Sequence, residues 1–259
     1  MNAPLFLSTA AVLLKRIDVG DNDLVLTYFT QARGKLSVIA KSARNSRKRF
    51  GGVLDIFTVS DVVCVQGRGR LPVLQEASLL QPFSNIRSNF VKTAYASYFA
   101  EILYHWMEPD AIQTQVFDLL CQVLDKIDRS LMPDALLSIV FQMTLMAISG
   151  LSPLLDRCCR CHTETDALKE CRIGVDFAQG GILCASCGRN GHSELYLSKG
   201  AIKLLQWLGC GDWNKIGRIR FSSESVRDAL LFLEMFVPHH IGKEPKSLAV
   251  LRQARNERM

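Results

Sequence analysis

The sequence predicts an α+β protein of several domains, in which a small five-stranded barrel precedes a mostly helical region that carries a four-cysteine zinc module. Three observations support this expectation. Short β-rich segments separated by turn residues fill the first 80 residues. Apolar residues with helical spacing begin near residue 86. Two C-x-x-C pairs then interrupt the helical pattern: Cys158 with Cys161, and Cys184 with Cys187.

The N-terminal part is predicted to form five short strands. Apolar and β-branched runs alternate with glycine-containing turns, a pattern that is typical of a small β-barrel. The third and fourth strands are joined by a polar segment, residues 42–52. The predicted strands cover residues 10–16, 24–30, 36–41, 57–65 and 71–77.

The rest of the chain is predicted to be helical, apart from the cysteine-containing part. Apolar residues recur at intervals of three and four, as one buried face of a helix requires. Ser222 and Ser223 are candidate N-caps for a late helix. The predicted helices cover residues 86–107, 110–129, 132–150, 198–208 and 222–236, and the basic tail after residue 237 is expected to end in a further helix.

The two C-x-x-C pairs predict one structural zinc site. Each pair forms a tight turn that directs two thiolates at one cation, and two such turns complete a tetrahedron. The 22 residues between the pairs suffice for a hairpin or loop closed by the metal. Four thiolates leave no position for water, so we expect this zinc to support structure and to perform no chemistry. Cys159 has the wrong spacing, whereas Cys171, His162 and His192 are alternative ligands.

A catalytic zinc site is the enzymatic alternative. His162-Thr163-Glu164 followed by Cys184-x-x-Cys187 faintly resembles the H-x-E…P-C-x-x-C signature of zinc deaminases. Leu183 stands where that signature has proline, and the first cysteine pair would have no role. No phosphate-binding loop and no nucleophile-elbow motif is found. We therefore predict that the protein has no catalytic residues and is not an enzyme.

Positive charge is concentrated near the third predicted strand. The formal net charge is +6, yet residues 31–50 contain seven basic residues and no acidic one. Such a patch attracts nucleic acid or another polyanion, and a solvated basic loop is the alternative interpretation. Nearby aromatic residues could stack on bases, although alternation places at least half of them in the core. They are Tyr28, Phe29, Phe50 and Phe57.

The cysteine content and the apolar segments indicate a cytoplasmic protein. Four of the nine cysteines form the C-x-x-C pairs, and Cys64, Cys121 and Cys210 are expected to be buried thiols. This usage fits a reducing compartment. No signal peptide is evident, and the most apolar internal stretch, residues 135–149, is too short and too polar for a membrane span.

Several stretches together resemble the RecO family of bacterial recombination mediators. They cover most of the chain in the expected order. The resemblance is specific because all of them occur together, and no single stretch would suffice. Departures are Asp21 in place of glutamate, Ser42 in place of glycine, and the doubled Cys158-Cys159. The matching stretches include Ala40-Lys41-Ser42-Ala43-Arg44, Gly51-Gly52-Val53-Leu54-Asp55, Leu74-Gln75-Glu76-Ala77, Glu101-Ile102-Leu103, Gly180-Gly181 within the zinc unit, and His240-Ile241-Gly242.

The resemblance implies an N-terminal OB-fold, a helical domain and an embedded zinc-binding module. It also implies binding to single- and double-stranded DNA, annealing of complementary strands and partnership with RecR. An interaction with single-stranded-DNA-binding protein and assistance in RecA loading are implied as well. The predicted domains are an OB-fold DNA-binding domain at 1–80, a first helical part at 81–152, the zinc module at 153–192 and a C-terminal helical part at 193–259.

The sequence thus predicts a non-enzymatic DNA-binding mediator of repair. Basic side chains of the barrel would follow the phosphates without reading sequence. The alternatives are a deaminase-like zinc hydrolase and a basic protein-interaction scaffold, for which the acidic tail of single-stranded-DNA-binding protein would be a suitable partner. The predicted DNA-contacting residues are Lys35, Lys41, Arg44, Arg47, Lys48, Arg49, Arg68 and Arg70.

Overall fold

The chain folds into two compact units. The computed structural model describes residues 6–44, 46–66, 69–188, 193, 195–209 and 220–257, and of Arg47 and Lys48 it describes only the backbone. Unit 1 comprises Met1–Arg129 and Pro245–Met259, and unit 2 comprises Ser130–Glu244. These units do not test the predicted domain boundaries at residues 80, 152 and 192, which stay predictions.

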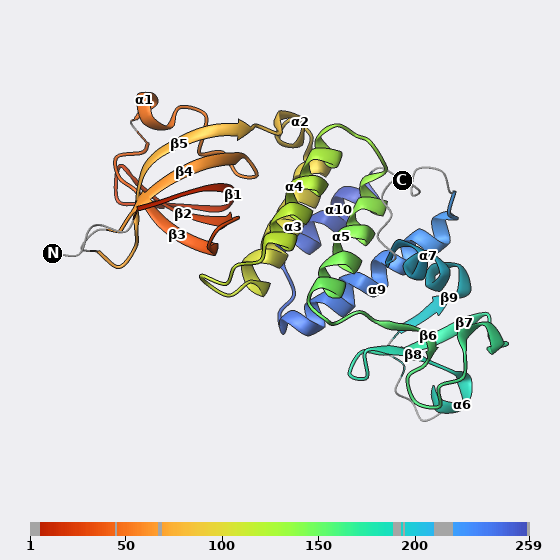
Figure 1. Ribbon diagram of the computed structural model, residues 1–259. Coiled ribbons are helices and arrows are strands. Elements are labelled where there is room, and N and C mark those ends of the chain that lie inside the picture. Colours follow the sequence, from red (N-terminus) through yellow and green to blue (C-terminus); the bar gives the residue numbers. More distant parts are fainter. Residues whose placement is uncertain are drawn as a thin grey trace. The chain divides into compact units, whose positions relative to one another are not determined.

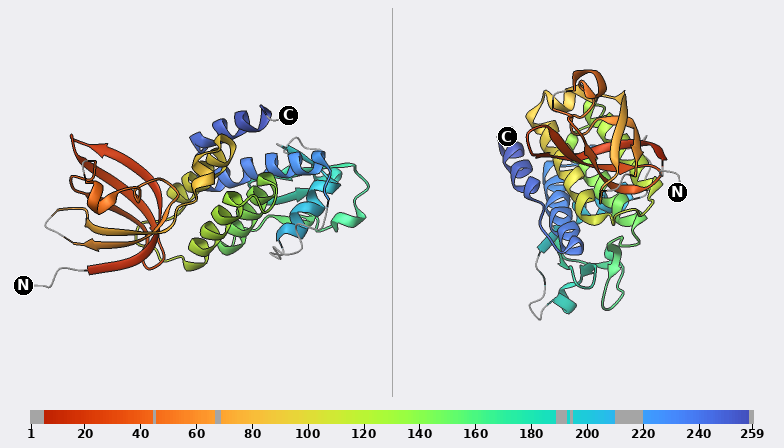
Figure 2. Two further views of the ribbon diagram at one scale, coloured as in Figure 1. Left: turned by 90° about the horizontal axis from the view of Figure 1, so that it is seen from above. Right: turned by 90° about the vertical axis from the view of Figure 1, so that its left-hand side faces the viewer.

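Five strands form the N-terminal part of unit 1, as the sequence predicts. Neighbouring strands pair in the order β1-β2-β3-β5-β4, and β4 pairs with β1, so that the sheet closes into a barrel (Figures 1 and 2). All pairs are antiparallel except β3 with β5, which meet in parallel at Ile39 and Val73. The strands are β1 (Phe6–Val19), β2 (Asp23–Thr30), β3 (Gly34–Ala40), β4 (Val59–Val65) and β5 (Val73–Gln81).

Alternation of side chains fills the barrel interior. Along β3, every second residue from Gly34 to Ala40 is buried, as a strand with one buried face requires. Leu13, Leu26 and Val38 are fully enclosed in this core. Burial of a side chain of this size stabilises the fold by about 1.5–3 kcal/mol. The period-two pattern of the sequence therefore places the barrel core correctly.

A close backbone contact joins the barrel to the helices of unit 1. Gly34, with φ +63°, leads into β3, and a Cβ at this position would lie 1.9 Å from the carbonyl oxygen of Ala111. The backbone of Asp110 donates a hydrogen bond to the carbonyl of Lys35, and the Asp110 carboxylate pairs with Arg33 at 2.9 Å. Only glycine permits this approach without strain. The β2–β3 turn thus packs closely against the segment that precedes α4.

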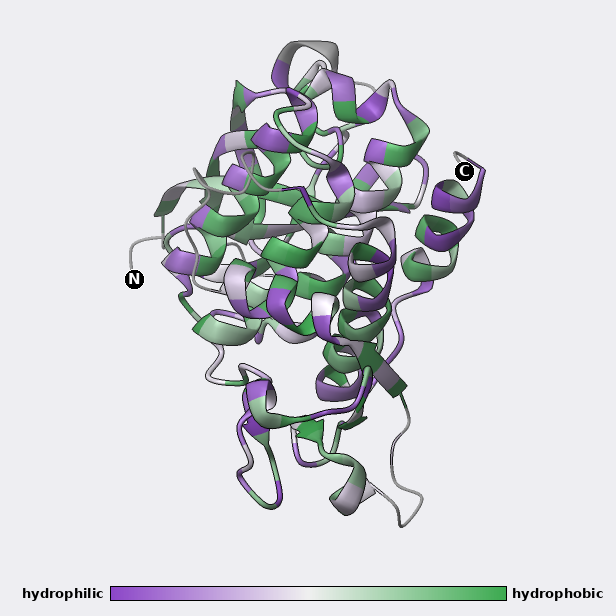
Figure 3. Ribbon diagram, turned by 90° about the vertical axis from the view of Figure 1, so that its right-hand side faces the viewer, coloured by the Kyte–Doolittle hydropathy of each residue, from purple (hydrophilic) through white to green (hydrophobic). Residues whose placement is uncertain are grey.

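Helices α2, α3, α4 and α10 complete unit 1. Asn89 caps α3, its side chain accepting a hydrogen bond from the backbone of Lys92. Figure 3 colours the ribbon by hydropathy and shows hydrophilic and hydrophobic residues together on the helices. The bounds are α2 (Ser84–Arg87), α3 (Phe90–Trp106), α4 (Thr114–Asp128) and α10 (Lys246–Asn256), and a short helix, α1 (Arg47–Phe50), lies between β3 and β4.

The carboxylate of Glu101 on α3 holds the N-terminus of α10. It accepts hydrogen bonds from the backbone amides of Lys246 and Ser247 at 3.0 and 2.8 Å, and from the Ser247 hydroxyl at 2.6 Å. These amides have no partner within the helix, and a negative charge at a helix N-terminus is favourable. Helix α10 consequently lies alongside α3, although about 140 residues of sequence separate them (Figures 1 and 2).

In the residues that the structure describes, unit 2 combines the helices α5, α7 and α9 with a small sheet. The segment predicted as a hairpin or loop forms a four-stranded sheet with the order β6-β8-β7-β9. Helix α9 passes through Pro238 and ends before Gly242, whose φ is +72°, so it is longer than predicted. The elements are α5 (Asp134–Ile148), β6 (Leu154–Cys158), η1 (Thr165–Ala167), β7 (Arg172–Asp176), β8 (Gly181–Leu183), α6 (Ala185–Gly188), β9 (Leu195–Ser198), α7 (Lys199–Gly209) and α9 (Ser223–Ile241).

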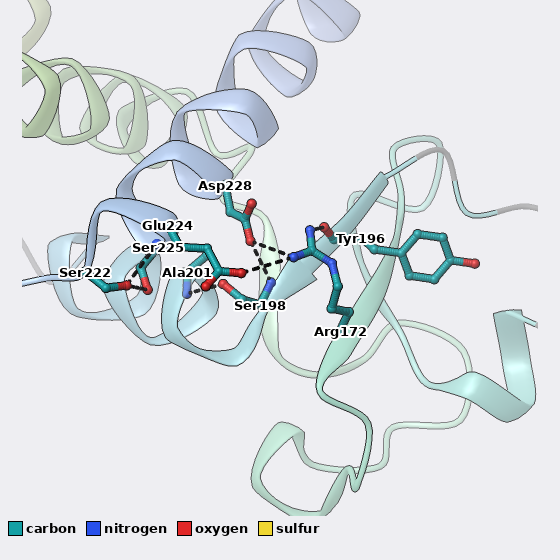
Figure 4. Close-up of polar contacts among 8 residues, drawn as sticks. All are labelled: Arg172, Tyr196, Ser198, Ala201, Ser222, Glu224, Ser225 and Asp228. Carbon is teal, nitrogen blue, oxygen red and sulfur yellow. Dashed lines mark hydrogen bonds and ion pairs between the residues drawn. The ribbon is translucent and has the colours of Figure 1, made fainter. Parts of the chain in front are cut away.

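Polar and aromatic contacts fasten this small sheet to α9. The guanidinium of Arg172 on β7 lies 3.4 Å from the carboxylate of Asp228, which also accepts a hydrogen bond from the backbone of Ser198 (Figure 4). Phe177, which follows β7, stacks on Phe232 of the same helix, with ring centroids 6.1 Å apart. The cysteine-containing sheet is therefore packed on the helices of unit 2 and is not a free finger.

A membrane span is not found in the part of the chain that the structure describes, where no helix is both long and apolar enough to cross a bilayer. Helix α5 is the most apolar of the long helices, and it buries Leu137, Phe141 and Leu145 in unit 2. The sequence interpretation of this stretch as a buried core helix is therefore confirmed.

Removal of the Glu101 charge should loosen α10. Burial alone would raise the pKa of Glu101, but hydrogen bonds from Ser247 and Lys246 outweigh it and lower this pKa below its usual 4.5. The stabilisation is therefore complete above about pH 4.5 and is lost as the pH falls through the lower pKa of the folded state. In Glu101→Gln, hydrogen exchange of the α10 amides at pH 7 should accelerate roughly tenfold to hundredfold, since a hydrogen bond to a charged group contributes about 1.5–3 kcal/mol.

Glu76→Gln provides the matched control, because Glu76 is exposed on β5. In this variant, hydrogen exchange of the α10 amides should proceed at the rate of the unmodified protein, both at pH 7 and at pH 3.5. Equal exchange rates for α10 in the Glu101→Gln variant and the unmodified protein would contradict the role of this carboxylate.

Candidate metal centre and nucleic-acid surface

The four cysteines of the two C-x-x-C pairs converge in unit 2. Their sulfur atoms all lie within 4.8 Å of one another, and the Sγ atoms of Cys161 and Cys184 are 3.5 Å apart. With zinc–sulfur bonds of about 2.3 Å, the sulfurs of a tetrahedral site are separated by roughly 3.8 Å. The four thiols therefore fit one tetrahedral metal ion. Cys158 and Cys184 are buried, Cys187 is half-buried and Cys161 is exposed.

The first cysteine pair lies in a turn at the end of β6. The backbone amide of His162 donates to the carbonyl of Cys158 at 3.0 Å, and the amide of Cys158 donates to Thr163 at 2.8 Å. His162 adopts the left-handed conformation with φ +60°, at the position where a glycine commonly ends such a turn. The hydroxyl of Thr163 lies 3.2 Å from the sulfur of Cys161.

The second pair follows β8, which must come very close to β6. A Cβ on Gly181 would lie 2.9 Å from both the Cβ and the carbonyl oxygen of Leu154, so this position requires glycine. Cys184 follows β8 directly, and its amide donates to the sulfur of Cys158 at 3.4 Å. Glu170 accepts a hydrogen bond from the amide of Ala185 and so fixes the start of α6, which carries Cys187.

A buried carboxylate links the two turns independently of metal. Asp176, at the end of β7, pairs with Arg160 at 3.1 Å, and it accepts a hydrogen bond from the amide of Gln179 at 3.0 Å. Arg160 stands between the two cysteines of the first pair, and Gln179 lies in the turn that leads to β8. The protein thus preorganises both halves of the thiol cluster.

Local hydrogen bonding gives the thiols of the cluster different pKa values. The side chain and backbone of Thr163 lower the pKa of Cys161 to about 6. The neighbouring Cys184 thiol is the main cause that raises the pKa of Cys187 to about 12. Metal binding must displace the remaining protons, so affinity for a metal falls as the pH falls.

The alternative ligands do not join this cluster among the residues that the structure describes. Neither Cys159, Cys171 nor His162 belongs to the group of converging ligand atoms. His192 lies outside the described residues, as does Cys210, one of the thiols expected to be buried. Of the other two, Cys64 is buried in the barrel and Cys121 is half-buried on α4. The converging ligand set consists of four thiols, without the histidine of the deaminase-like alternative.

In the barrel, the structure gathers three of the predicted DNA-contacting residues beside the β1–β2 turn. The guanidinium of Arg49 donates to the carbonyl of Lys41 at 2.6 Å, and the backbone of Arg44 donates to the carbonyl of Asn22 in this turn at 3.2 Å. Lys41, Arg44 and Arg49 are all exposed. We call residues 41–49 the basic loop. The guanidinium of Arg49 lies over the ring of Phe50, 4.9 Å from its centroid.

Three acidic residues adjoin the basic loop. Asp18 lies 4.0 Å from Arg44, and both side chains are about half exposed. Asp23 accepts a hydrogen bond from the amide of Ser42 at 2.7 Å, and Asp21 is exposed in the same turn. These carboxylates reduce the local positive potential, an effect that the linear charge pattern of residues 31–50 does not reveal.

Lys35 lies at the opposite end of β3 and is held by the helices of unit 1. Its Nζ donates to the carbonyl of Tyr104 at 2.7 Å, and it lies 5.3 Å from the centroid of the Tyr104 ring. Lys15 also lies over this ring, at 4.6 Å. Lys35 therefore supports the contact between barrel and helices, and a DNA contact by Lys35 stays a prediction.

The other predicted DNA-contacting residues are placed only in part. Arg70 is exposed after β4, Arg68 lies outside the described residues, and Arg47 and Lys48 are known only as part of the α1 backbone. The four aromatic residues suggested for base stacking are all in the core, each at most 4% exposed: Tyr28, Phe29, Phe50 and Phe57. An exposed aromatic side chain of the barrel is that of Phe6, 67% exposed at the start of β1, which begins before the first predicted strand.

The excess positive charge belongs to unit 1. Residues 1–82 contain 11 Lys and Arg against six Asp and Glu, whereas residues 130–244 contain 12 of each. Attraction of a polyanion therefore favours the barrel over the thiol-containing unit. The two candidate sites thus differ in chemistry as well as in position along the chain.

Comparisons with known proteins agree along the whole chain. The family described as "Recombination protein O N terminal" matches residues 1–83, and "Recombination protein O C terminal" matches residues 87–249. The DNA repair protein RecO of Desulfatibacillum aliphaticivorans is 42% identical over 96% of this chain and 97% of its own. Those of Desulfosudis oleivorans and Syntrophus aciditrophicus are 37% and 32% identical, over 96% and 97% of this chain and 98% and 97% of their own.

Removal of one thiol should abolish tight metal binding. Cys184→Ser is expected to weaken zinc binding at least about 100-fold, because even changes outside the ligand set typically cost 10–100-fold. Zinc content and chelator competition measure this loss. Hydrogen exchange should accelerate in β8 and α6 but not in the barrel, whose residues belong to unit 1.

The matched control is Cys171→Ser, which changes an exposed thiol outside the cluster. It should retain one equivalent of zinc with unchanged affinity. Retention of tightly bound zinc by the Cys184→Ser variant would show that the four thiols are not the ligand set.

Proposed function

This chain belongs to the RecO family, whose curated relatives are DNA repair proteins, and on that premise we propose that it binds DNA through its N-terminal barrel during repair. The single observation that carries this proposal is the gathering of Lys41, Arg44 and Arg49 on one exposed part of the barrel. The charge distribution supports it, because unit 2 has no excess of positive charge.

We infer that the barrel is an OB-fold. Support comes from its five strands, from closure in the order β1-β2-β3-β5-β4, and from the parallel contact between β3 and β5. OB-folds bind nucleic acid with the face of the second and third strands and with the loops that join strands 1–2 and 4–5. The basic loop borders the first of these loops, and Arg70 belongs to the second.

The proposed DNA contacts are to phosphates. Arg and Lys neutralise phosphate charge and release bound counterions, which provides affinity without sequence specificity. The aromatic residues near the basic loop are buried, so base stacking contributes little there. Arg47, Lys48 and Arg68 are proposed as further phosphate contacts because of their charge.

Strand annealing would need no catalytic residue. Neutralisation of two strands at once lowers their repulsion and raises their local concentration, after which base pairing provides the driving force. On this basis we propose a mediator that anneals complementary strands and assists RecA loading together with RecR, on DNA covered by single-stranded-DNA-binding protein. A cytoplasmic location at the nucleoid follows from this role.

The thiol cluster is proposed to hold one structural zinc ion. Cys158, Cys161, Cys184 and Cys187 would complete its coordination and leave no position for a reacting water. The ion would cross-link the ends of β6 and β8 within unit 2. Zinc-dependent hydrolysis has no support in this arrangement, since Glu164 is exposed and His162 is outside the cluster.

Binding to single-stranded DNA should depend steeply on salt. If about six phosphates are contacted, the logarithm of the binding constant should fall with the logarithm of salt concentration at a slope of roughly −4. Replacement of Arg44, Arg47 and Arg49 by alanine should weaken binding equally for all sequences and reduce the slope by about 2. Fluorescence anisotropy with labelled oligonucleotides at several salt concentrations measures both quantities.

Asp18→Asn provides a charge change in the opposite direction at the same place. It removes the carboxylate beside Arg44 and should strengthen binding, by about threefold to tenfold at low salt, while metal content stays unchanged. A slope near zero, or a sequence-selective loss in the triple variant, would contradict phosphate binding by the basic loop.

A further inference from the structure

We propose that the thiol cluster is an oxidation site, at which a peroxide links Cys161 to Cys184 by a disulfide and thereby expels the metal. The proposal rests on the proposed structural zinc. Its basis is an asymmetry in the cluster: one sulfur faces solvent, and its partner in the opposite C-x-x-C pair lies 3.5 Å away.

Accessibility selects the first sulfur to react. Cys161 is exposed, whereas Cys158 is fully enclosed and Cys184 is 7% exposed. A small oxidant therefore reaches the Cys161 sulfur without any opening of the fold. The hydroxyl of Thr163, 3.2 Å from this sulfur, can donate a hydrogen bond to it and to an oxygen transferred onto it.

Cys184 is proposed as the second sulfur, because it lies 3.5 Å from the sulfur of Cys161. The Cys184 sulfur must move about 1.5 Å to form a disulfide bond of about 2.05 Å with Cys161. Cys158 is held back by two backbone hydrogen bonds, and its sulfur accepts the amide of Cys184. The resulting link joins one C-x-x-C pair to the other.

The chemistry balances with a peroxide as the oxidant. The Cys161 thiolate attacks the oxygen–oxygen bond of hydrogen peroxide, which gives a sulfenic acid and hydroxide. The Cys184 thiolate then attacks the Cys161 sulfur, the sulfur–sulfur bond forms and a second hydroxide leaves. Two protons convert both hydroxides to water. The peroxide is reduced by two electrons, and the two thiolates are oxidised by two.

Loss of two ligands of four releases the metal, but the protein keeps a cross-link at the same place. Cys161 follows β6 and Cys184 follows β8, and these strands are paired neighbours. The disulfide would therefore join the same two segments that the metal joins. The attachment to α9 through Arg172 and Asp228 involves neither cysteine and should survive oxidation.

The test uses the zinc-loaded full chain treated with increasing amounts of hydrogen peroxide. A chromogenic chelator records released zinc, and mass spectrometry of peptides maps disulfides. We expect one zinc released per Cys161–Cys184 disulfide formed, no other disulfide within the cluster, and restoration of zinc binding after reduction. Zinc content before oxidation is measured separately, so failure of the proposed metal site is distinguished from failure of the oxidation step.

Two control variants and one variant within the cluster test the assignment. Cys159→Ser and Cys171→Ser change thiols outside the cluster and should release zinc at the unmodified rate. In the unmodified protein, zinc that stays bound after Cys159 and Cys171 are fully oxidised would overturn the proposal. A disulfide that contains Cys159, or one that lies within a single C-x-x-C pair, would overturn it as well. In metal-free Cys161→Ser, disulfide formation by Cys184 should slow at least tenfold, and an unchanged rate would also overturn it.

Discussion

The carboxylate of Glu101 anchors the C-terminal helix α10 in unit 1, to which the chain returns after it has formed unit 2. The chain leaves unit 1 after Arg129 and returns to it at Pro245, and Glu101 holds the returning helix by three hydrogen bonds. The apolar face of α10, with Leu248 and Leu251, is buried as well. The intervening residues, which form unit 2, are therefore attached to unit 1 at both ends.

A second constraint shapes the proposed DNA-binding surface. The close approach at Gly34 commits one end of β3 to the helices, and Lys35 is held there by the carbonyl and ring of Tyr104. The other end of β3 leads into the basic loop, in which Lys41, Arg44 and Arg49 are exposed. The same strand thus connects a structural contact with the surface proposed for DNA. Of the lysines at its two ends, Lys35 is held by Tyr104 and Lys41 is exposed.

The thiol cluster is supported by its surroundings as much as by its spacing. Gly181 allows β8 to approach β6, and the pair of Arg160 with Asp176 fixes the first turn to the segment that precedes β8. Preorganisation of this kind lowers the entropic cost of metal binding. It also leaves the four cysteines unequal in exposure, and the proposed oxidation begins at the exposed one, Cys161.

The sequence by itself determined the five-stranded sheet, the helical region and the four thiols, because alternation, helical spacing and C-x-x-C pairs are local patterns. It also identified the family, through short stretches in a fixed order. Only the tertiary structure showed that Lys35 is bound by Tyr104, that Phe57 is buried, and that Asp18 lies beside Arg44. These contacts join residues far apart in the chain, and local periodicity carries no information about such partners. The four-stranded sheet around the thiols was likewise decided by long-range pairing of very short strands, whose sequences are too brief to show a period.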